Sequence, residues 1–214
     1  MNLELDSPPT TEEVVKALKE MSAVKAPESD AIPADVYKAG GPLLLDEITQ
    51  LFQPFLDKEQ LHQEFRDATI VHIYKRKGNR HSCDNHRDIS LLPISCKVLA
   101  LVLLNRLLHH LGQGLLPESQ CGFRAGQGTV DMIFAARQLQ EKCTERHRDL
   151  YTTFVDLSKA FDTVSRDGLW KIMSKFGCAH KLITVVRQFH EGMQALVLDD
   201  GEPSESFPVS NGVK

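Results

Sequence analysis

The 214-residue sequence predicts an α+β protein that is rich in helices and has a small antiparallel sheet. Several long segments repeat apolar residues at helical spacing, whereas a few short runs are rich in β-branched and aromatic residues. Hydrophobic residues make up 42% of the chain and charged residues 25%, a balance typical of a globular protein with a buried core.

The amino-terminal third is predicted to be helical. Thr10 or Thr11 can cap a first helix, because their hydroxyl groups can accept a bond from a free amide of its first turn. Pro33 suits the first turn of a short second helix, and Pro54 predicts a kink near the end of a third. The three predicted helices are residues 12–21, 33–41 and 43 to about 56.

The middle of the chain places one strand before two long helices. Residues 68–74 are β-branched and aromatic, which predicts a strand, and residues 75–87 form a polar loop. A helix rich in Leu and Val is predicted from Pro93 to about residue 111, where glycines end it. After a Gly-rich connection, a second long helix is expected over residues 129–146. Its inward-facing residues would be Met132, Ile133, Ala136 and Leu139.

The last third returns to strands. An apolar run predicts a buried strand, and two helical segments follow it. The sequence Asp199-Asp200-Gly201 favours a hairpin turn, since Asp-Gly tolerates the positive φ angles of such turns. The predicted elements are a strand at 151–157, helices at 167–176 and 180–192, and hairpin strands at 195–198 and 206–209.

The composition also bears on compartment and partners. The net charge is −4, so the chain has no overall basic field of the kind that favours strong nucleic-acid binding. Five cysteines without a C-x-x-C pair indicate free thiols in a reducing compartment. The amino terminus does not resemble a secretory signal, and the apolar run at 98–104 is too short to span a bilayer. We therefore expect an intracellular protein, in the cytoplasm or nucleus, without a membrane segment; its oligomeric state does not follow from the sequence.

The most informative segment is FVDLSKAFD at residues 154–162. A predicted buried strand ends there in Asp156, and a second acid, Asp162, follows six residues later. A carboxylate fixed at a strand end can hold Mg²⁺, which phosphoryl transfer requires. The pattern alone leaves a second interpretation open, in which Asp156 only caps the start of a helix.

This segment resembles F-x-D-x-x-x-A-F-D, the first palm motif of reverse transcriptases from LINE-like (non-long-terminal-repeat) retrotransposons. The resemblance implies that Asp156 binds both catalytic Mg²⁺ ions, with help from the backbone carbonyl of Leu157. It implies that Phe161 screens the 2′ position of the incoming nucleotide sugar. Asp162 is expected to have a structural role.

Two upstream segments resemble fingers motifs of the same family. They are IYKRKG at residues 73–78 and NHRDISLL at 85–92. The resemblance implies that Arg87 grips the nucleotide triphosphate, with Lys75 and Lys77 as further cationic donors. On the residues alone, a solvated hairpin tip would explain this basic loop equally well.

The segment QCGFRAGQGTVD at residues 120–131 resembles the family motif that enters the palm. The resemblance implies that Arg124 contacts template or primer, and that Gly122 and Gly126 let the nucleic acid approach the backbone. A Gly-rich loop that only starts the helix at Thr129 is the alternative.

The segment FPVSNGVK at residues 207–214 resembles the start of the next palm motif. Asp199-Asp200 precedes this segment, whereas the family's second catalytic acid pair follows it, so we interpret Asp199-Asp200 as a turn. The resemblance implies a right-hand polymerase fold with fingers at about residues 1–130 and an incomplete palm at about 131–214, truncated before that acid pair.

The expected function is that of a domain fragment of an RNA-directed DNA polymerase. The complete parent would use Mg²⁺ and two-metal catalysis, with an RNA template, a DNA primer and deoxynucleoside triphosphates as partners. Departures from the family pattern occur at residues 28, 29 and 31, at His86 and at Gln127. The fragment itself is expected to be inactive, and a non-catalytic RNA-binding module or an unstable pseudogene relic is the alternative.

Overall fold

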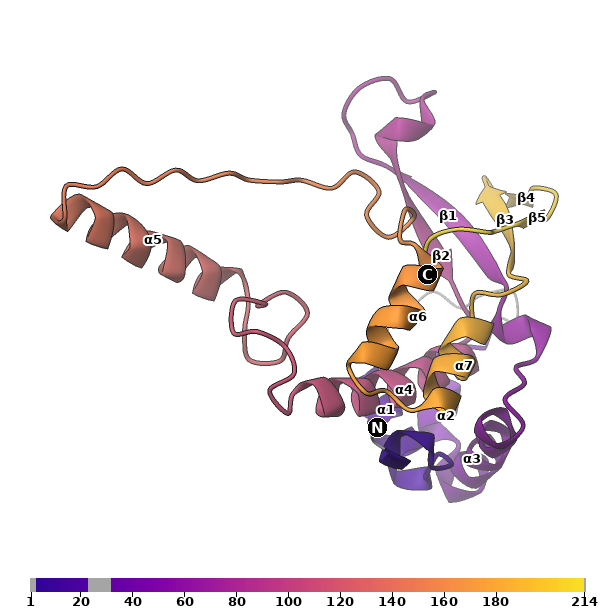
Figure 1. Cartoon of the computed structure of the whole chain (residues 1–214). Helices are drawn as coiled ribbons and strands as arrows, with labels where there is room; N and C mark the ends of the chain where they lie inside the picture. Colours follow the sequence, from indigo (N-terminus) through magenta and orange to yellow (C-terminus); the bar gives the residue numbers. More distant parts are fainter. Residues whose placement is uncertain (1–2, 23–31, 214) are drawn as a thin grey trace. The chain divides into compact units, whose positions relative to one another are not determined.

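The computed structural model of the chain (Figure 1) describes residues 3–22 and 32–213. The motif departures at residues 28, 29 and 31 therefore lie outside the described residues. The chain forms two compact units. The main unit contains Met1–Leu107 and Phe161–Lys214, and the second unit contains Leu108–Ala160.

The predicted amino-terminal helices are confirmed in the main unit. Thr10 is the cap of the first: its hydroxyl accepts a bond from the amide of Glu13, whose carboxylate accepts one from the amide of Thr10. The elements of this region are η1 (Leu3–Asp6), α1 (Thr11–Glu20), α2 (Ala34–Ala39), α3 (Gly41–Asp57) and η2 (Gln63–Phe65).

Three further helices complete the core of the main unit: α4 (Ile94–Leu111), which runs to Leu107 within this unit, α6 (Arg166–Lys175) and α7 (His180–Gln188). Phe52 and Leu56 of α3, Leu99 of α4 and Leu182 of α7 are fully buried in one apolar cluster. By length and by its mean hydropathy of 1.4, α4 is apolar enough to cross a membrane. A core helix meets the same criteria, and 44% of α4 is buried within the fold.

The sheet of the main unit is mixed, so the prediction of an antiparallel sheet was wrong. Its order is β2-β1-β3-β4, with β5 also paired to β3. β1 and β3 are parallel, with Ala68 opposite Ala195, because helices cross over between them. The strands are β1 (Ala68–Tyr74), β2 (His86–Leu91), β3 (Gln194–Asp199), β4 (Glu202–Pro203) and β5 (Phe207–Pro208).

The strand β2 was not predicted, whereas the turn after β3 was. β2 forms an antiparallel hairpin with β1, seen as the long ribbon that projects from the helices of the main unit in Figure 1. Asp200 and Gly201 have φ angles of 48° and 88° and connect Asp199 to its partner Glu202. Asp199-Asp200-Gly201 is thus the tight turn that the sequence indicated.

The second unit contains the helix α5 (Thr129–Glu145), whose predicted burial was wrong. Met132, Ile133 and Leu139 expose 45%, 55% and 58% of their surface, and Ala136 is exposed too. Apolar spacing fixes which residues share a helix face, but burial of that face needs a partner surface. In the described part of the second unit, α5 has no buried residue.

Residues 151–157 do not form the predicted buried strand. The segment has no regular secondary structure, and Tyr151 and Phe154 expose 89% and 92% of their surface. Figure 1 draws it as an extended trace after α5. A strand is stable only when a neighbouring strand accepts its backbone hydrogen bonds, and no strand pairs with this segment in residues 3–22 and 32–213.

Candidate functional site

The β1–β2 hairpin brings two of the predicted nucleotide-binding residues to one face. Arg87 lies opposite Ile73 in the register, and Lys75 follows Ile73 by two residues, so strand alternation puts Lys75 and Arg87 on the same side. The amide of Lys75 donates to the carbonyl of Asn85 across 2.8 Å, which extends the pairing beyond β1. The ammonium of Lys75 donates to the carbonyl of Asp84, also at 2.8 Å.

Lys77 lies at the exposed tip of this hairpin. The chain reverses there through Arg76 and Gly78, whose φ angles are 56° and 78°. The hydroxyl of Tyr74 donates to the carbonyl of Gly78 at 2.5 Å and ties the tip back to β1. The φ angle of 78° favours glycine at position 78, because other L residues rarely adopt it.

The opposite face of the hairpin borders a separate cavity of about 910 Å³. It is lined by His72 and His86, whose rings lie 5.0 Å apart, and by Asp199, which lies 3.5 Å from Nε2 of His72. Neither Lys75 nor Arg87 lines it. The cations predicted to bind a triphosphate thus face away from this histidine-lined cavity.

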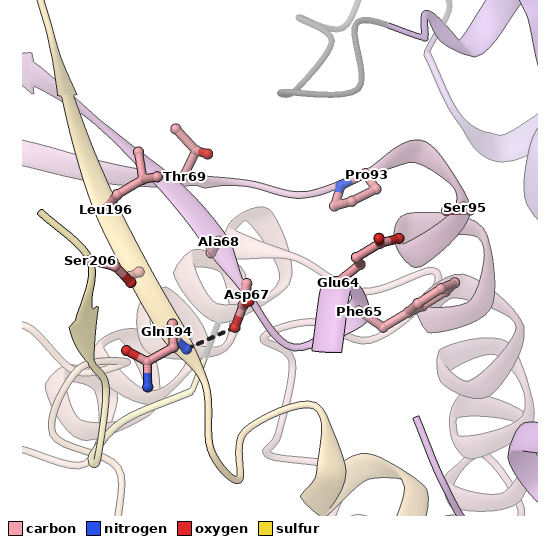
Figure 2. A pocket seen from close by; sticks show the side chains of 11 residues that line it. Glu64, Phe65, Asp67, Ala68, Thr69, Pro93, Ser95, Gln194, Leu196 and Ser206 are labelled. Atoms are coloured by element: carbon pink, nitrogen blue, oxygen red, sulfur yellow. Dashed lines mark hydrogen bonds between the residues drawn. The ribbon is translucent and has the colours of Figure 1, made fainter. Parts of the chain in front are cut away.

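A second cavity, of about 450 Å³, lies where β1 and β3 begin (Figure 2). Asp67 lines it and accepts a hydrogen bond from the backbone amide of Gln194 at 2.9 Å, the dashed line of Figure 2. The side chain of Gln63 donates to the same carboxylate oxygen at 2.7 Å. None of the sequence-predicted site residues lines this cavity, and Asp67 serves to join the first residues of the two parallel strands.

Phe161 lies beside the segment Asn211-Gly212-Val213 in the main unit. The amide of Val213 donates to the carbonyl of Phe161 across 2.9 Å. Gly212 has a φ angle of 73°, and a Cβ there would lie 2.6 Å from the backbone oxygen of Asp162. The end of the segment at residues 154–162 and the segment at residues 207–213 therefore touch through their backbones.

Arg166, the first residue of α6, completes this contact. Its guanidinium donates to the carbonyls of Gly212 at 2.7 Å, Asn211 at 3.2 Å and His190 at 2.7 Å. Burial lowers the pKa of Arg166, while the nearby charge of Glu191 acts in the opposite direction. Sequence reasoning missed Arg166. The available signal was a cation in the first turn of a helix, where the helix dipole disfavours it unless it has other partners.

The remaining predicted site residues belong to the second unit. Asp156 is exposed and Leu157 exposes 70% of its surface, both on the segment that forms no strand. Arg124 is partly buried, and its guanidinium donates to the carbonyl of Pro117 at 3.2 Å. Gly122 and Gly126 are exposed, and a Cβ at Gly126 would meet open space. The predicted residues are thus divided between the two units.

The arrangement of acidic, His and Cys side chains bears on the expected magnesium site. Asp156 offers a single exposed carboxylate. In residues 3–22 and 32–213, no three His, Cys, Asp or Glu side chains come close enough together to hold a metal ion. Mg²⁺ gives up its waters reluctantly and is usually fixed by more than one anionic group, so these residues alone do not fit a catalytic magnesium centre.

Comparison with known proteins identifies the family of this chain. Residues 73–214 match the model of the family described as reverse transcriptase (RNA-dependent DNA polymerase). The chain belongs to the reverse transcriptase family. The match begins within the β1–β2 hairpin and contains Arg87, Asp156 and the contact of Phe161 with Val213. This match confirms the resemblance to reverse transcriptases, and the relatives from mobile elements extend it to LINE-like retrotransposons.

Relatives from mobile elements align with nearly all of this reverse transcriptase sequence. The RNA-directed DNA polymerase from mobile element jockey of Drosophila melanogaster is 29% identical over 206 residues, which cover 95% of this chain and 22% of that protein. The probable RNA-directed DNA polymerase from transposon X-element of the same species is 30% identical over 99% of this chain and 24% of its own length. An uncharacterized 149 kDa protein of transposon TX1 from Xenopus laevis is 23% identical over 98% of this chain. The chain thus spans about a quarter or less of these relatives.

Proposed function

We propose that this chain supplies the fingers and the first part of the palm of an RNA-directed DNA polymerase encoded by a LINE-like retrotransposon. The observation that carries the proposal is the family match over residues 73–214. The shared face of Lys75 and Arg87 and the contact between Phe161 and Val213 support it. The division into fingers at about residues 1–130 and palm at about 131–214 is part of the proposal.

Each predicted residue has a proposed role in the complete protein. Arg87 and Lys75 bind the triphosphate of a deoxynucleotide from one face of the hairpin, and Lys77 adds a cation at its tip. Phe161 restricts the space at the 2′ position of the sugar. In the second unit, Arg124, Gly122 and Gly126 contact the RNA template or DNA primer.

Asp156 and the carbonyl of Leu157 are proposed as one half of the metal-binding site of the complete protein. Two-metal catalysis holds its ions about 3.5–4 Å apart, which requires several anionic ligands. Asp199-Asp200 is not proposed for this role, because this pair precedes the segment at residues 207–214, whereas the family's second acid pair follows it. We therefore propose that the 214-residue chain alone does not extend a primer. We also propose that it acts in the cytoplasm or nucleus as part of a larger polypeptide.

Nucleotide binding by the purified chain tests the role of the hairpin. Arg87→Ala should weaken binding of a deoxynucleoside triphosphate about tenfold, because it removes a charge-assisted donor. Arg80→Ala is the matched control: Arg80 lies in the loop between β1 and β2 and lines the histidine cavity, which Arg87 does not, so its loss should change the dissociation constant less than twofold. If both variants lose the same affinity, the effect is one of overall charge, and the proposed nucleotide site is wrong.

Primer extension tests the requirement for further acidic ligands. The wild-type chain, Asp156→Asn and the double variant Asp199→Asn/Asp200→Asn should all give only background incorporation of deoxynucleotides. Incorporation by the wild type that is lost in Asp156→Asn would show that this chain already contains a working metal site. If incorporation is lost in the double variant instead, Asp199 and Asp200 take part in catalysis.

A further inference from the structure

We infer that Arg166 is a positioning residue: its guanidinium holds Asn211-Gly212-Val213 against the backbone of Phe161 and so sets where the Phe161 side chain stands. The part of this inference that concerns nucleotide selection rests on the proposed function. The geometric part concerns only residues of the main unit.

The hydrogen bonds of Arg166 converge on one place from two parts of the chain. Nε and Nη2 donate to the carbonyls of the consecutive residues Gly212 and Asn211, at 2.7 and 3.2 Å. Nη1 donates to the carbonyl of His190, just after α7, at 2.7 Å. A planar guanidinium can reach acceptors in several fixed directions at once, whereas an ammonium is a single point of charge. Arg166 therefore fixes the Asn211-Gly212 peptide relative to the end of α7.

The same segment also lies close to the backbone of Asp162. The position of a Cβ at Gly212 would lie 2.6–2.8 Å from three backbone atoms of Asp162, so the two backbones are in close contact. The next amide, of Val213, then reaches the carbonyl of Phe161. Arg166 and the backbone of Asp162 thus both contact this segment, and the bond from Val213 ties the backbone of Phe161 to it.

Arg166 is not needed to start its own helix. Ser165 caps α6, since its hydroxyl accepts a hydrogen bond from the amide of Gly168 at 3.3 Å. A cation at the first position of a helix is otherwise unfavourable, because the helix dipole is positive there. The bonds to the three carbonyls account for its presence at this position.

Phe161 exposes 61% of its surface, so packing encloses less than half of its side chain. The position of its backbone therefore has a large part in deciding where the ring stands. If the ring screens the sugar of a nucleotide, a shift of this backbone changes the distinction between a 2′ hydrogen and a 2′ hydroxyl. Arg166 would act on that distinction without touching the nucleotide.

Amide hydrogen exchange in the 214-residue chain tests the geometric part. In Arg166→Met, exchange at Val213 should become about tenfold faster, while exchange at Leu99 in the core should not change. Arg166→Lys should recover part of the protection, because an ammonium can still reach one of the carbonyls. Arg137→Met is the control, since Arg137 is exposed on α5 in the second unit and should leave Val213 unaffected. Unchanged exchange at Val213 in Arg166→Met would overturn the inference.

Binding of dUTP and UTP, which differ only at the 2′ position, to the same variants tests the consequence. Wild type should prefer dUTP, and this preference should fall several-fold in Arg166→Met and recover in part in Arg166→Lys. Faster exchange without any change in preference would make Arg166 a structural contact only and overturn the inference. If wild type binds neither nucleotide, the proposed function fails, and exchange alone still decides the geometric part. If Arg166→Met does not fold, Arg166→Lys decides both.

Discussion

Val213 donates its backbone amide to the carbonyl of Phe161 across 2.9 Å, although the two residues belong to different sequence motifs. This bond joins the end of the FVDLSKAFD segment to the end of the FPVSNGVK segment. In Figure 1 the last described residues accordingly lie beside the start of α6. We therefore expect a substitution that displaces the backbone of one segment to displace the backbone of the other.

Gly212→Ala should be costly because two effects add. An alanine must adopt a φ angle of 73°, and its Cβ must push the backbone of Asp162 away. We expect a loss in the free energy of unfolding of about 3 kcal/mol, measured by urea denaturation. Gly201→Ala is the matched control, since Gly201 has a φ angle of 88° but open space around it, and should cost about 1 kcal/mol. Equal costs would mean that the contact with Asp162 gives way without strain.

Arg106→Met should destabilise the main unit by about 3 kcal/mol. The guanidinium of Arg106 makes two hydrogen bonds of 2.6 Å to the carboxylate of Glu13 and donates to the carbonyls of Ser7 and Pro8. Its side chain is only 9% exposed, so the substitution leaves a half-buried carboxylate without its cation. Thermal or urea unfolding measures the change. Breaking the exposed pair of Arg187 and Glu191 by Arg187→Met should cost less than about 0.5 kcal/mol.

Glu13 should make stability depend on acidic pH. Burial alone would raise the pKa of Glu13, but the hydrogen bonds from Arg106 and Thr10 and the charge of Arg106 lower it below its ordinary value of 4.5. Because the pKa is lower in the folded state, this contribution is fully present above 4.5 and is lost as the pH falls through the lowered value. Urea unfolding from pH 7 to pH 3 should show a shallower acid-side loss in Glu13→Gln than in wild type. Parallel curves would contradict this role of Glu13.

Limited proteolysis should cleave the chain within residues 151–157 before it cleaves elsewhere in the fold. Tyr151 and Phe154 are almost fully exposed on a segment without regular structure, whereas Phe52 is fully buried. Chymotrypsin should therefore cleave after Tyr151 or Phe154 well before any site in the helical core. Mass spectrometry of the first fragments measures this order. Resistance of both sites would indicate that the segment pairs as a strand, as its sequence pattern first predicted.

Elements governed by local chemistry were predictable from the sequence. The cap at Thr10 and the turn at Asp200 and Gly201 depend on residues within a few positions, and both were confirmed. Strand β2 was missed because His86, Arg87 and Asp88 have little intrinsic preference for a strand, and pairing with β1 decides their conformation. The parallel pairing of β1 with β3 was missed because its partners are far apart in sequence.

The failures in the second unit have a different cause. Periodicity correctly placed α5, whereas the apolar pattern at Tyr151 and Phe154 predicted a strand that does not form. Burial, however, depends on a second surface, which a sequence pattern does not specify. For the candidate site, the family resemblance predicted Arg87 and Phe161, whereas Arg166 was found only from the carbonyls that surround it.

The parallel alignment of β1 with β3 also governs how the chain folds as it leaves the ribosome. Asp67 and Gln194, which open this alignment, are 127 residues apart. The β1–β2 hairpin can close as soon as residue 91 has been made, yet the edge of β1 that receives β3 stays uncovered through the synthesis of four more helices. An uncovered strand edge can pair with other chains, so the interval before β3 emerges is when nascent copies of this protein are most exposed to misassembly on polysomes.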